Sequence, residues 1–403
     1  MKRFFVIALI VGVALFLGVA SCPVSAQRIE SVFDGHRIII PESSIPEPGR
    51  HHTNYFFVDS DQPTNAPDPR DETPGSLACV YKLVTGPTGC PIATSKTVPS
   101  GGIGAIAIVD AGFYPTAQSD LSAFDAQFGI PDTTITQVWP GTVQPPTYND
   151  WLFEEALDIE WAHAMAPKAK LFLVVSKLCT NAKCNTDPTW AAVKKAANLV
   201  ATHGGGVVSM SFGDPEIAEE TTFDTYMTHT GVVYFAASGD SGLGVSIYPG
   251  ASPNVVSVGG TRFMRDQNGN FTSEVYYTGG GGGDLSPYEP RPAYQDGVAN
   301  IVGAQRGYPD VASDYCCAAI FLQGSWFSVG GTSWGSPTFA GIVNAAGSRQ
   351  TSSNAQLTMM YNELANPTEY KADFFDITQG DSRCKTGWDL CTGIGSPRTY
   401  AGK

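Results

Sequence analysis

From Gly101 onward, short apolar runs alternate with helix-like segments, and this alternation restricts the possible folds more than any other feature. The runs are apolar at nearly every position, which is typical of strands buried on both faces of a parallel sheet. We therefore predict an α/β fold with a doubly wound, mostly parallel sheet and helices on both faces. Strands are expected at 105–109, 134–138, 170–175, 207–211, 232–236 and 254–258, and helices at 116–128, 150–165, 189–202 and 217–230.

Polar residues follow three of these predicted strands. Asp110, Ser211 and Asp240 each lie at or just past the carboxyl end of a strand. Open parallel sheets bind ligands at this edge. The three residues are therefore candidates for a functional site.

The stretch 330–337, GGTSWGSP, places Ser333 where a loop becomes a helix. A glycine pair allows a tight turn, and Pro337 suits a first helical turn because its missing N–H would be unpaired there. This arrangement can present a nucleophilic hydroxyl at a helix N-terminus. The stretch taken alone equally fits a Gly/Ser turn that caps a core helix.

The predicted helix 150–165 carries Glu154 and Asp158, which are four residues apart and therefore neighbours on one face. Burial and mutual repulsion would separate their pKa values, so that one carboxylate can act as a base. The alternative is an ordinary acidic face in solvent, shared with Glu155 and Glu160.

The order of these motifs resembles the subtilisin-like proteases, but none of the six histidines lies in an H-G-T-H-type segment. Glu154 stands where that histidine would be. The chain is therefore identified as a member of the sedolisin family, the serine-carboxyl peptidases. The motifs that carry the resemblance over residues 100–400 are E-E-A-L-D at 154–158, S-G-D-S-G at 238–242 and G-G-T-S-x-x-x-P at 330–337.

The resemblance implies that Ser333 attacks the scissile carbonyl, Glu154 accepts its proton and Asp158 orients Glu154. Asp240 would donate a hydrogen bond to the oxyanion, for which it must be protonated. A carboxylate base also works best near its own pKa, so activity is expected in acid. Asp110 is assigned a structural or supporting role.

Two further sites follow from the resemblance. The segment Ser211-Phe212-Gly213 would pair with substrate backbone by β-augmentation, although it is also a core strand and turn. One structural calcium ion is expected near the C-terminus, with a capped turn as the alternative. Its ligands would be the side chains of Asp376 and Asp389 and the carbonyls of Ile377, Lys385 and Gly387. Lys385 departs from the family, which usually has glycine there.

The first 26 residues read as a signal peptide, with Lys2 and Arg3 before an apolar run and a cleavage site after Ala26. An alternative is a lipoprotein box ending at Cys22. We expect a secreted or periplasmic protein without stable membrane insertion after signal removal. The domains are predicted as signal peptide 1–26, N-terminal extension 27–95 and peptidase domain 96–403, with no room for the long folded propeptide that the family commonly carries.

Eight cysteines remain after the signal, an even number that favours disulfides in an exported chain. The local pairs are 79 with 90, 179 with 184, 316 with 317, and 384 with 391. A zinc site lacks a C-x-x-C pair or a nearby histidine. The net charge of −14 makes nucleic acid an unsuitable partner.

The sequence thus predicts a monomeric, exported, acid-acting endopeptidase. Tripeptidyl-peptidase activity is the alternative, because the sequence does not show whether the substrate cleft is closed at one end. The substrate is expected to be a protein or peptide. The rival from another class is a catalytically silent, sedolisin-like binding protein of the cell envelope. All four catalytic positions are filled, which argues against that rival.

Overall fold

The computed structural model describes residues 29–33, 35–178, 188–278 and 281–403. Its central sheet follows the order β12-β11-β9-β7-β4-β6-β5, with β15 also paired to β11. Every pairing in this sheet is parallel except that of β12 with β11. The strands are β4 Ala105–Ala111, β5 Ile135–Val138, β6 Lys170–Ser176, β7 Gly206–Met210, β9 Val232–Ala237, β11 Val256–Arg265, β12 Phe271–Tyr276 and β15 Val311–Asp314.

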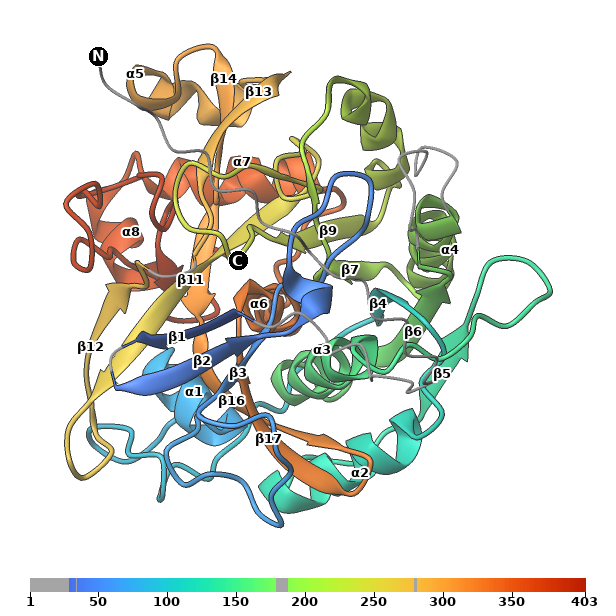
Figure 1. The fold of residues 1–403 in the computed structure, drawn as a ribbon. Coiled ribbons are helices and arrows are strands. Elements are labelled where there is room, and N and C mark those ends of the chain that lie inside the picture. Colours follow the sequence, from blue (N-terminus) through green and yellow to red (C-terminus); the bar gives the residue numbers. More distant parts are fainter. Residues whose placement is uncertain (1–28, 34, 179–187, 279–280) are drawn as a thin grey trace, which may run out of the picture.

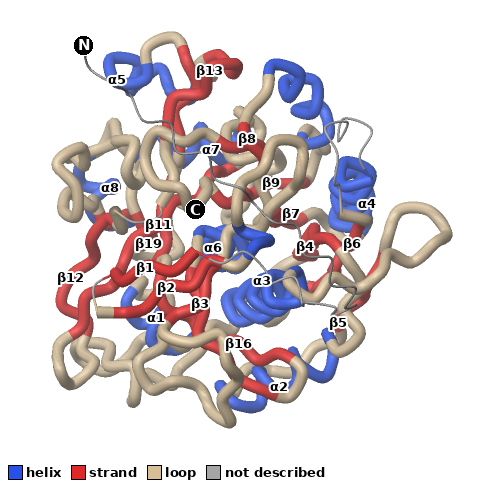
Figure 2. The backbone as a smooth tube through the Cα atoms, in the orientation of Figure 1, coloured by secondary structure: helices blue, strands red, loops and turns tan. Residues whose placement is uncertain are grey.

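Helices cover both faces of this sheet, which confirms the predicted fold class (Figures 1 and 2). Alternate residues of each strand face opposite sides, so β4 places Ile106 and Ile108 in one core and Ala107 and Val109 in the other. The first core also contains side chains of α2, α3 and α6, and the second those of α4. These helices are α2 Ala117–Phe128, α3 Trp151–Met165, α4 Pro188–Thr202 and α6 Thr332–Ala346.

Close backbone packing explains one glycine in the sheet. A Cβ on Gly206, at the start of β7, would lie 1.8 Å from the carbonyl oxygen of Ala105. No other residue type fits at that point, so the glycine permits the β4–β7 pairing.

A second sheet joins the N-terminal region to the strands that lead to Ser333. Its order is β1-β2-β3-β17-β16, and all its pairings are antiparallel. In Figure 1 the blue N-terminal strands β1 and β2 are drawn just below α6. These strands are β1 Ile29–Phe33, β2 His36–Ile40, β3 Phe56–Val58, β16 Cys316–Leu322 and β17 Ser325–Gly330.

Shorter elements complete the chain. The remaining helices are α1 Pro74–Val80, α5 Ala299–Val302, α7 Ser353–Glu363 and α8 Pro367–Asp373, with 3₁₀ segments η1 Glu42–Ser44, η3 Ala218–Met227 and η4 Ala293–Val298. The remaining strands are β8 Asp214–Pro215, β10 Ile247–Tyr248, β13 Asp284–Pro290, β14 Gln305–Tyr308, β18 Phe374–Phe375 and β19 Ser396–Pro397. None of the helices in the described ranges has both the length and the apolar character needed to span a bilayer.

Two predicted elements differ from the structure. The segment predicted as a helix at 217–230 is the 3₁₀ segment η3, because its run of Glu and Thr offers few apolar side chains to hold an α-helix on the core. The strand predicted at 254–258 is the longer β11, which continues through Gly259 and Gly260 because β15 and β12 pair along its second half.

Three of the four predicted disulfides are present: Cys79–Cys90, Cys316–Cys317 and Cys384–Cys391. The predicted Cys179–Cys184 bond lies outside the described residues, as do the predicted signal cleavage site and Cys22.

Candidate active site

Ser333 is the second residue of α6 and is fully buried. The helix N-cap is Gly331, whose φ of 132° is open to glycine and strained for other residues. Two other chain segments lie close to this glycine. A Cβ at position 331 would lie 2.0 Å from the Asn54 carbonyl oxygen and 2.8 Å from Asp240 Oδ2. The glycine therefore lets backbone and carboxyl group approach the serine.

Pro337 lies inside α6, not in its first turn as the sequence suggested, because the helix begins at Thr332. A proline has no N–H for the carbonyl four residues earlier, which is that of Ser333. The Ser211 hydroxyl oxygen lies 3.3 Å from this carbonyl oxygen. The proline thus frees the Ser333 carbonyl for a partner from another element.

Helix α3 carries Glu154, Glu155, Asp158 and Glu160, and all four are fully buried. The alternative of an acidic face in solvent is therefore wrong. Glu160 accepts the N–H of Phe321 at 3.1 Å and has a structural partner. The hydroxyl of Ser211 donates to both oxygens of Asp158, at 2.9 and 2.8 Å.

Burial, and after it the charge of Asp110, raise the pKa of Glu154 well above the ordinary range of a carboxyl group. The nearby Ser333 hydroxyl and Asn54 N–H act in the opposite direction, although neither forms a well-aligned hydrogen bond shorter than 3.5 Å with Glu154. Burial, Asp110 and Glu154 likewise raise the pKa of Asp158. These carboxyl groups therefore raise one another's pKa values, and Glu154 lies beside the hydroxyl it would deprotonate.

Asp110 lies at the end of β4 and belongs to this group of carboxyl groups. The sequence predicted only a structural or supporting role for it. Burial raises its pKa to about 8, and it in turn raises the pKa values of Glu154, Glu155 and Asp158. Its position past a strand end was the available signal. The extent of its influence depends on packing between β4 and α3, which the sequence does not show.

Asp240 follows β9 on the other side of Ser333. Its Oδ1 accepts the N–H of Thr332 at 2.8 Å and the Thr332 hydroxyl at 2.7 Å. Burial raises the pKa of Asp240 to about 7, despite the opposing effect of the Thr332 donors and the Tyr315 hydroxyl. A small part of the side chain still reaches solvent. Asp240 is thus held beside the serine and is protonated in acid.

The predicted substrate edge, Ser211-Phe212-Gly213, lies directly after β7. The Ser211 carbonyl accepts the Ser333 hydroxyl at 3.2 Å, while the Ser211 side chain binds Asp158. Phe212 is buried against Trp190, and Gly213 forms an antiparallel bridge to His52. The edge is therefore next to the serine, and it is paired with another segment of the same chain.

The predicted calcium ligands gather in the turn between β18 and β19. Asp376 accepts the Gly387 N–H at 3.0 Å, and Asp389 accepts the N–H groups of Lys385, Cys391 and Thr392. Burial raises the pKa of Asp389 to about 6, and the charge of Asp376 adds to the increase. Two carboxylates that repel each other suit a cation. The ammonium of Lys385 is bonded to the Ser382 carbonyl at 2.7 Å, and Ile377 is buried.

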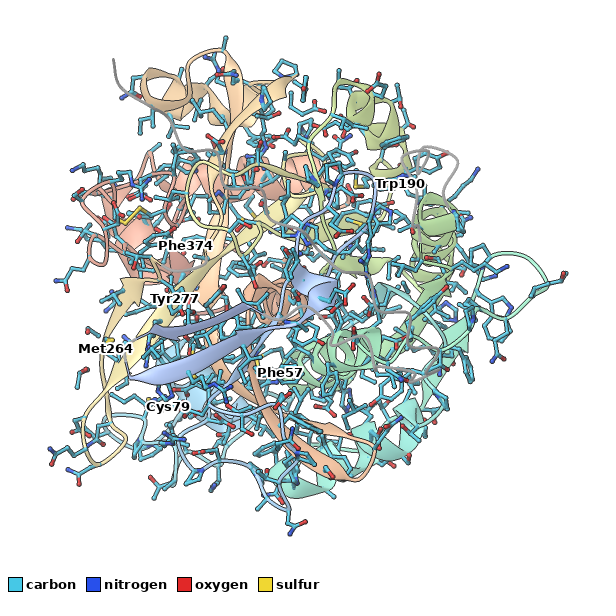
Figure 3. All side chains as sticks on the ribbon, in the orientation of Figure 1. Phe57, Cys79, Trp190, Met264, Tyr277 and Phe374 are labelled. Atoms are coloured by element: carbon cyan, nitrogen blue, oxygen red, sulfur yellow. A yellow bond between two sulfur atoms is a disulfide. The ribbon has the colours of Figure 1, made fainter. Side chains whose placement is uncertain are left out.

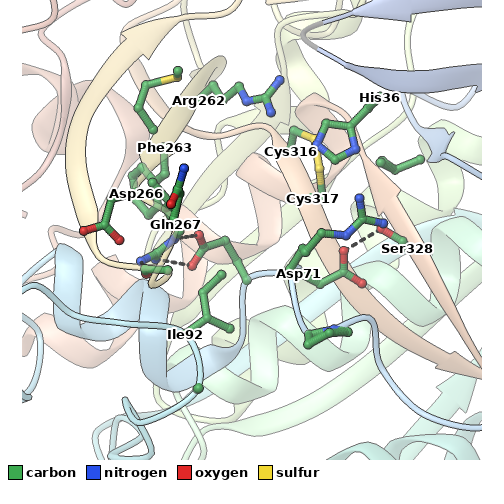
Figure 4. A pocket seen from close by; sticks show the side chains of 18 of the residues that line it. His36, Asp71, Ile92, Arg262, Phe263, Asp266, Gln267, Cys316, Cys317 and Ser328 are labelled. Carbon is green, nitrogen blue, oxygen red and sulfur yellow. Dashed lines mark hydrogen bonds and ion pairs between the residues drawn. A yellow bond between two sulfur atoms is a disulfide. The ribbon is translucent and has the colours of Figure 1, made fainter.

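A cavity of about 570 Å³ lies away from Ser333, beside the Cys316–Cys317 disulfide (Figure 4). Its charged groups already have partners, because Arg265 pairs with Glu72 and the Ser328 hydroxyl donates to Asp71 at 2.6 Å. This cavity therefore lacks a reactive group of the kind found around Ser333.

The segment around Asn54 is the largest omission of the sequence interpretation. Its N–H donates to Ser333 Oγ at 3.1 Å, and its side-chain amide donates to the Ser211 carbonyl at 2.7 Å. No motif or periodicity marks this segment, and its place depends on β3 pairing with β17, some 270 residues later in the chain.

Comparison with known proteins agrees with this geometry. Residues 153–371 match the Subtilase family (Peptidase_S8). The match covers more than half of the 403 residues. The chain therefore belongs to the subtilase family.

Individual relatives indicate which kind of subtilase this chain resembles. Kumamolisin from Bacillus sp. (strain MN-32) is 31% identical over 70% of this chain and 56% of its own length. Tripeptidyl-peptidase 1 from Dictyostelium discoideum is 24% identical over 69% of this chain and 50% of its own. The chain thus spans about half the length of these curated relatives.

A solved structure shares the fold. Pseudomonas sedolisin (serine-carboxyl proteinase) superposes with a TM-score of 0.66 at 21% identity, over 81% of this chain and 95% of that one. This likeness confirms the subtilisin-like fold. Within the subtilases the chain is a member of the sedolisin family, as its three motifs predicted.

Proposed function

We propose that this chain is a serine-carboxyl peptidase that hydrolyses peptide bonds through an acyl-enzyme on Ser333. The observation that carries the proposal is a buried serine hydroxyl at a helix N-terminus beside the buried carboxyl group of Glu154. A serine hydroxyl needs an adjacent base to become a nucleophile. Glu154 is in position to accept the proton, and Asp158 to hold that proton within the pair.

The oxyanion is assigned to two donors. The backbone N–H of Ser333 points out of the helix start, and Asp240 lies on the other side of Gly331. Only a protonated Asp240 can donate, since a carboxylate would repel the developing charge. With its pKa at about 7, the protonated form of Asp240 prevails in acid. We therefore propose that activity increases as the pH falls below about 7.

The experiment is a digest of a denatured protein from pH 2 to pH 8 by the wild type, by Ser333→Ala and by Ser336→Ala. Ser336 is a matched control, because it is buried on the same helix and its hydroxyl contacts Ser209 at 2.9 Å. We expect the Ser333→Ala activity to fall by about 10⁴-fold or more, and Ser336→Ala to resemble the wild type. A neutral optimum, or activity that survives Ser333→Ala, would exclude the proposal.

The name of the relative from Dictyostelium discoideum supports tripeptidyl-peptidase activity. We assign endopeptidase activity, and mass spectrometry of the same digests distinguishes it from the release of successive tripeptides. We further propose export and a monomeric state, on the signal-like N-terminus and the single-chain site. All four catalytic positions are filled and adjacent, which does not favour a silent binding protein.

We also propose one structural calcium ion held by Asp376 and Asp389, with carbonyls of Ile377, Lys385 and Gly387. The oxygen donor set suits this cation, and it would relieve the repulsion between the two carboxylates. We expect a chelator to lower the Tm of the wild type and added Ca²⁺ to restore it. Asp389→Asn should remove this response. A wild-type Tm that changes with neither the chelator nor Ca²⁺ would contradict the proposed calcium site.

A further inference from the structure

Two adjacent cysteines, Cys316 and Cys317, form a disulfide at the start of β16. Cys316 lies opposite Gly330 of β17, and Ala318 already lies opposite Val329, so the register shifts at this point. Cys317 is an extra residue in the ladder, as in a β-bulge. The disulfide therefore sits at a bulge that begins opposite the glycine pair leading to the nucleophile.

This bond is poorly suited to stabilising the fold as a whole. A disulfide stabilises mainly by restricting the unfolded chain, and the gain grows with the number of residues between the two cysteines. Cys79 and Cys90 are 11 positions apart, whereas Cys316 and Cys317 are 1 position apart. A bond between neighbours connects no separate elements, so its effect is on the local path of the backbone.

Tyr315 comes directly before the disulfide and contacts the active site at two points. Its carbonyl oxygen accepts the Gly331 N–H at 2.8 Å, at the N-cap of α6. Its buried hydroxyl donates a hydrogen bond to the side chain of Asp240. A change in the backbone path at Cys316 would therefore reach both the start of the serine helix and the proposed oxyanion donor.

The Tyr315 ring is closely surrounded. It packs against Phe56 at 5.0 Å and against Tyr277, labelled in Figure 3, at 4.5 Å between ring centroids. A Cβ on Gly260 would lie 2.5 Å from a carbon of the same ring. The ring has little room to turn by itself, so the position of its hydroxyl follows the backbone at residue 315.

We propose that the Cys316–Cys317 disulfide positions the oxyanion side of the active site through Tyr315, and that its reduction converts the peptidase to a low-activity state. This inference rests on the proposed function. Opening the disulfide lets the bulge relax and moves Tyr315 away from Asp240 and Gly331. The substrate edge after β7 is held by β4 and β9 and stays in place. The effect is therefore on kcat more than on KM.

A reductant can reach this bond. Both cysteines line the cavity of about 570 Å³ in Figure 4, and Arg70 and Gln267 of the same lining are exposed to solvent. A thiolate of a small dithiol attacks one sulfur, and the other cysteine leaves as a thiolate and takes up a proton. The second thiol of the reagent then displaces the first cysteine. Two electrons and two protons pass to the cysteines, and the dithiol becomes a cyclic disulfide.

The first test treats the folded wild type with dithiothreitol at pH 8 and measures peptide hydrolysis at pH 4. Exchange needs a thiolate, so acid preserves the redox state during the assay. We expect kcat to fall by about 10- to 100-fold, somewhat less than for the loss of an oxyanion donor, and to return on reoxidation. Alkylation and mass spectrometry identify the reduced cysteines. Full kcat with Cys316 and Cys317 reduced would overturn the proposal.

The second test assigns the response to one disulfide. Cys316→Ser/Cys317→Ser should have the low kcat of the reduced wild type and should not respond to dithiothreitol. The matched control is Cys79→Ser/Cys90→Ser, which should lower the Tm, leave kcat unchanged and keep the response. A response that persists in Cys316→Ser/Cys317→Ser, or that disappears in the control, would overturn the proposal.

The third test is Tyr315→Phe, which removes the hydroxyl and keeps the ring. The hydroxyl stabilises the carboxylate of Asp240 and so lowers its pKa. Without it this pKa is higher, and we expect the alkaline limit of kcat to move to higher pH. Reduction of the disulfide should move the limit in the same direction. An unchanged limit in both cases would contradict a role for Tyr315.

Other titratable groups also face Asp240, namely Glu154 of α3 and His52, which lines a cavity shared with Asp240. A matched control therefore accompanies Tyr315→Phe. Tyr361→Phe also removes a buried hydroxyl from a carboxyl group, because the Tyr361 hydroxyl donates to Asp310 at 2.8 Å. It should lower the Tm without changing the pH profile, since Asp310 takes no part in the proposed reaction.

The outcomes separate the two proposals. Failure of the oxidised wild type and of every variant to hydrolyse peptides would overturn the proposed function. Hydrolysis that is the same before and after reduction would overturn only the role of the disulfide. If Cys316→Ser/Cys317→Ser does not fold, reversible reduction of the wild type and the pH profile of Tyr315→Phe decide the question.

Discussion

Glu154 and Asp310 are both fully buried carboxyl groups, yet their surroundings are opposite. Asp310 accepts hydrogen bonds from Arg306 at 2.8 and 2.6 Å, from the Tyr361 hydroxyl at 2.8 Å and from the Ser257 N–H at 2.8 Å. In the part of the chain that the structure describes, Glu154 forms no ion pair, and it lies among other carboxyl groups. Asp310 is thus paired with a cation, whereas the charged neighbours of Glu154 are carboxyl groups, which raise its pKa. Burial alone therefore does not mark a reactive carboxyl group.

The largest effect is expected when Glu154 is replaced by Gln, which is of the same shape and is not a base. We expect kcat/KM to fall by about 10⁴-fold. The Tm should be unchanged or higher, since a buried acid among like charges is removed. The control is Glu160→Gln on the same helix, and a similar loss of activity there would show that the two buried glutamates are equivalent.

Asp310→Asn should show the opposite pattern. It leaves the charge of buried Arg306 without its counter-ion, and we expect the free energy of unfolding to fall by about 3–5 kcal/mol. Urea denaturation measures the loss, and kcat of the folded fraction should persist. The surface pair Asp381–Arg383 serves as control, because Asp381→Asn should change stability by about 1 kcal/mol or less.

Variants of Asp240 test whether its raised pKa contributes to catalysis. Asp240→Ala should lower kcat by about 10²–10³-fold, the effect of removing one oxyanion donor. Asp240→Asn keeps a donor at every pH, so its loss should be smaller and its activity should extend above pH 7, where wild-type Asp240 ionises. Identical pH profiles for the wild type and Asp240→Asn would assign the alkaline limit to another group.

Glu274 lies between the two extremes, because it is buried and accepts hydrogen bonds from neutral hydroxyls, among them those of Thr261 and Ser396. Burial raises its pKa to about 7, above the value of about 4.3 in an unfolded chain. The folded state thus binds more protons, so this contribution to stability is complete below about pH 4 and is lost as the pH rises through 7. Glu274→Gln should flatten the decline of Tm between pH 4 and pH 8. If the Tm of Glu274→Gln declines with pH as steeply as that of the wild type, Glu274 does not cause the decline.

The sequence predicted most of the central sheet because its strands are long apolar runs and its helices are amphipathic. Ser333, Glu154, Asp158 and Asp240 came from motifs whose spacing is fixed within single elements. What surrounds them depends on contacts between distant elements, such as Asp110 on β4 and Asn54 before β3. Their residue types are ordinary at those positions, so only the fold reveals their proximity. The position of Pro337 was misjudged for a related reason, since the start of α6 is set by Gly331 and its neighbours.

The place of β3 in the second sheet has a consequence for the solubility of the molecule. Phe57 of β3, labelled in Figure 3, packs against Phe153 of α3 at 4.9 Å between ring centroids. Loss of the residues before Tyr55 would remove β1 and β2 and leave β3 as an edge strand that is paired on one side with β17. Exposed strand edges promote association between molecules. Strands β1 and β2 therefore cover an edge of this sheet, and their removal would favour association between molecules.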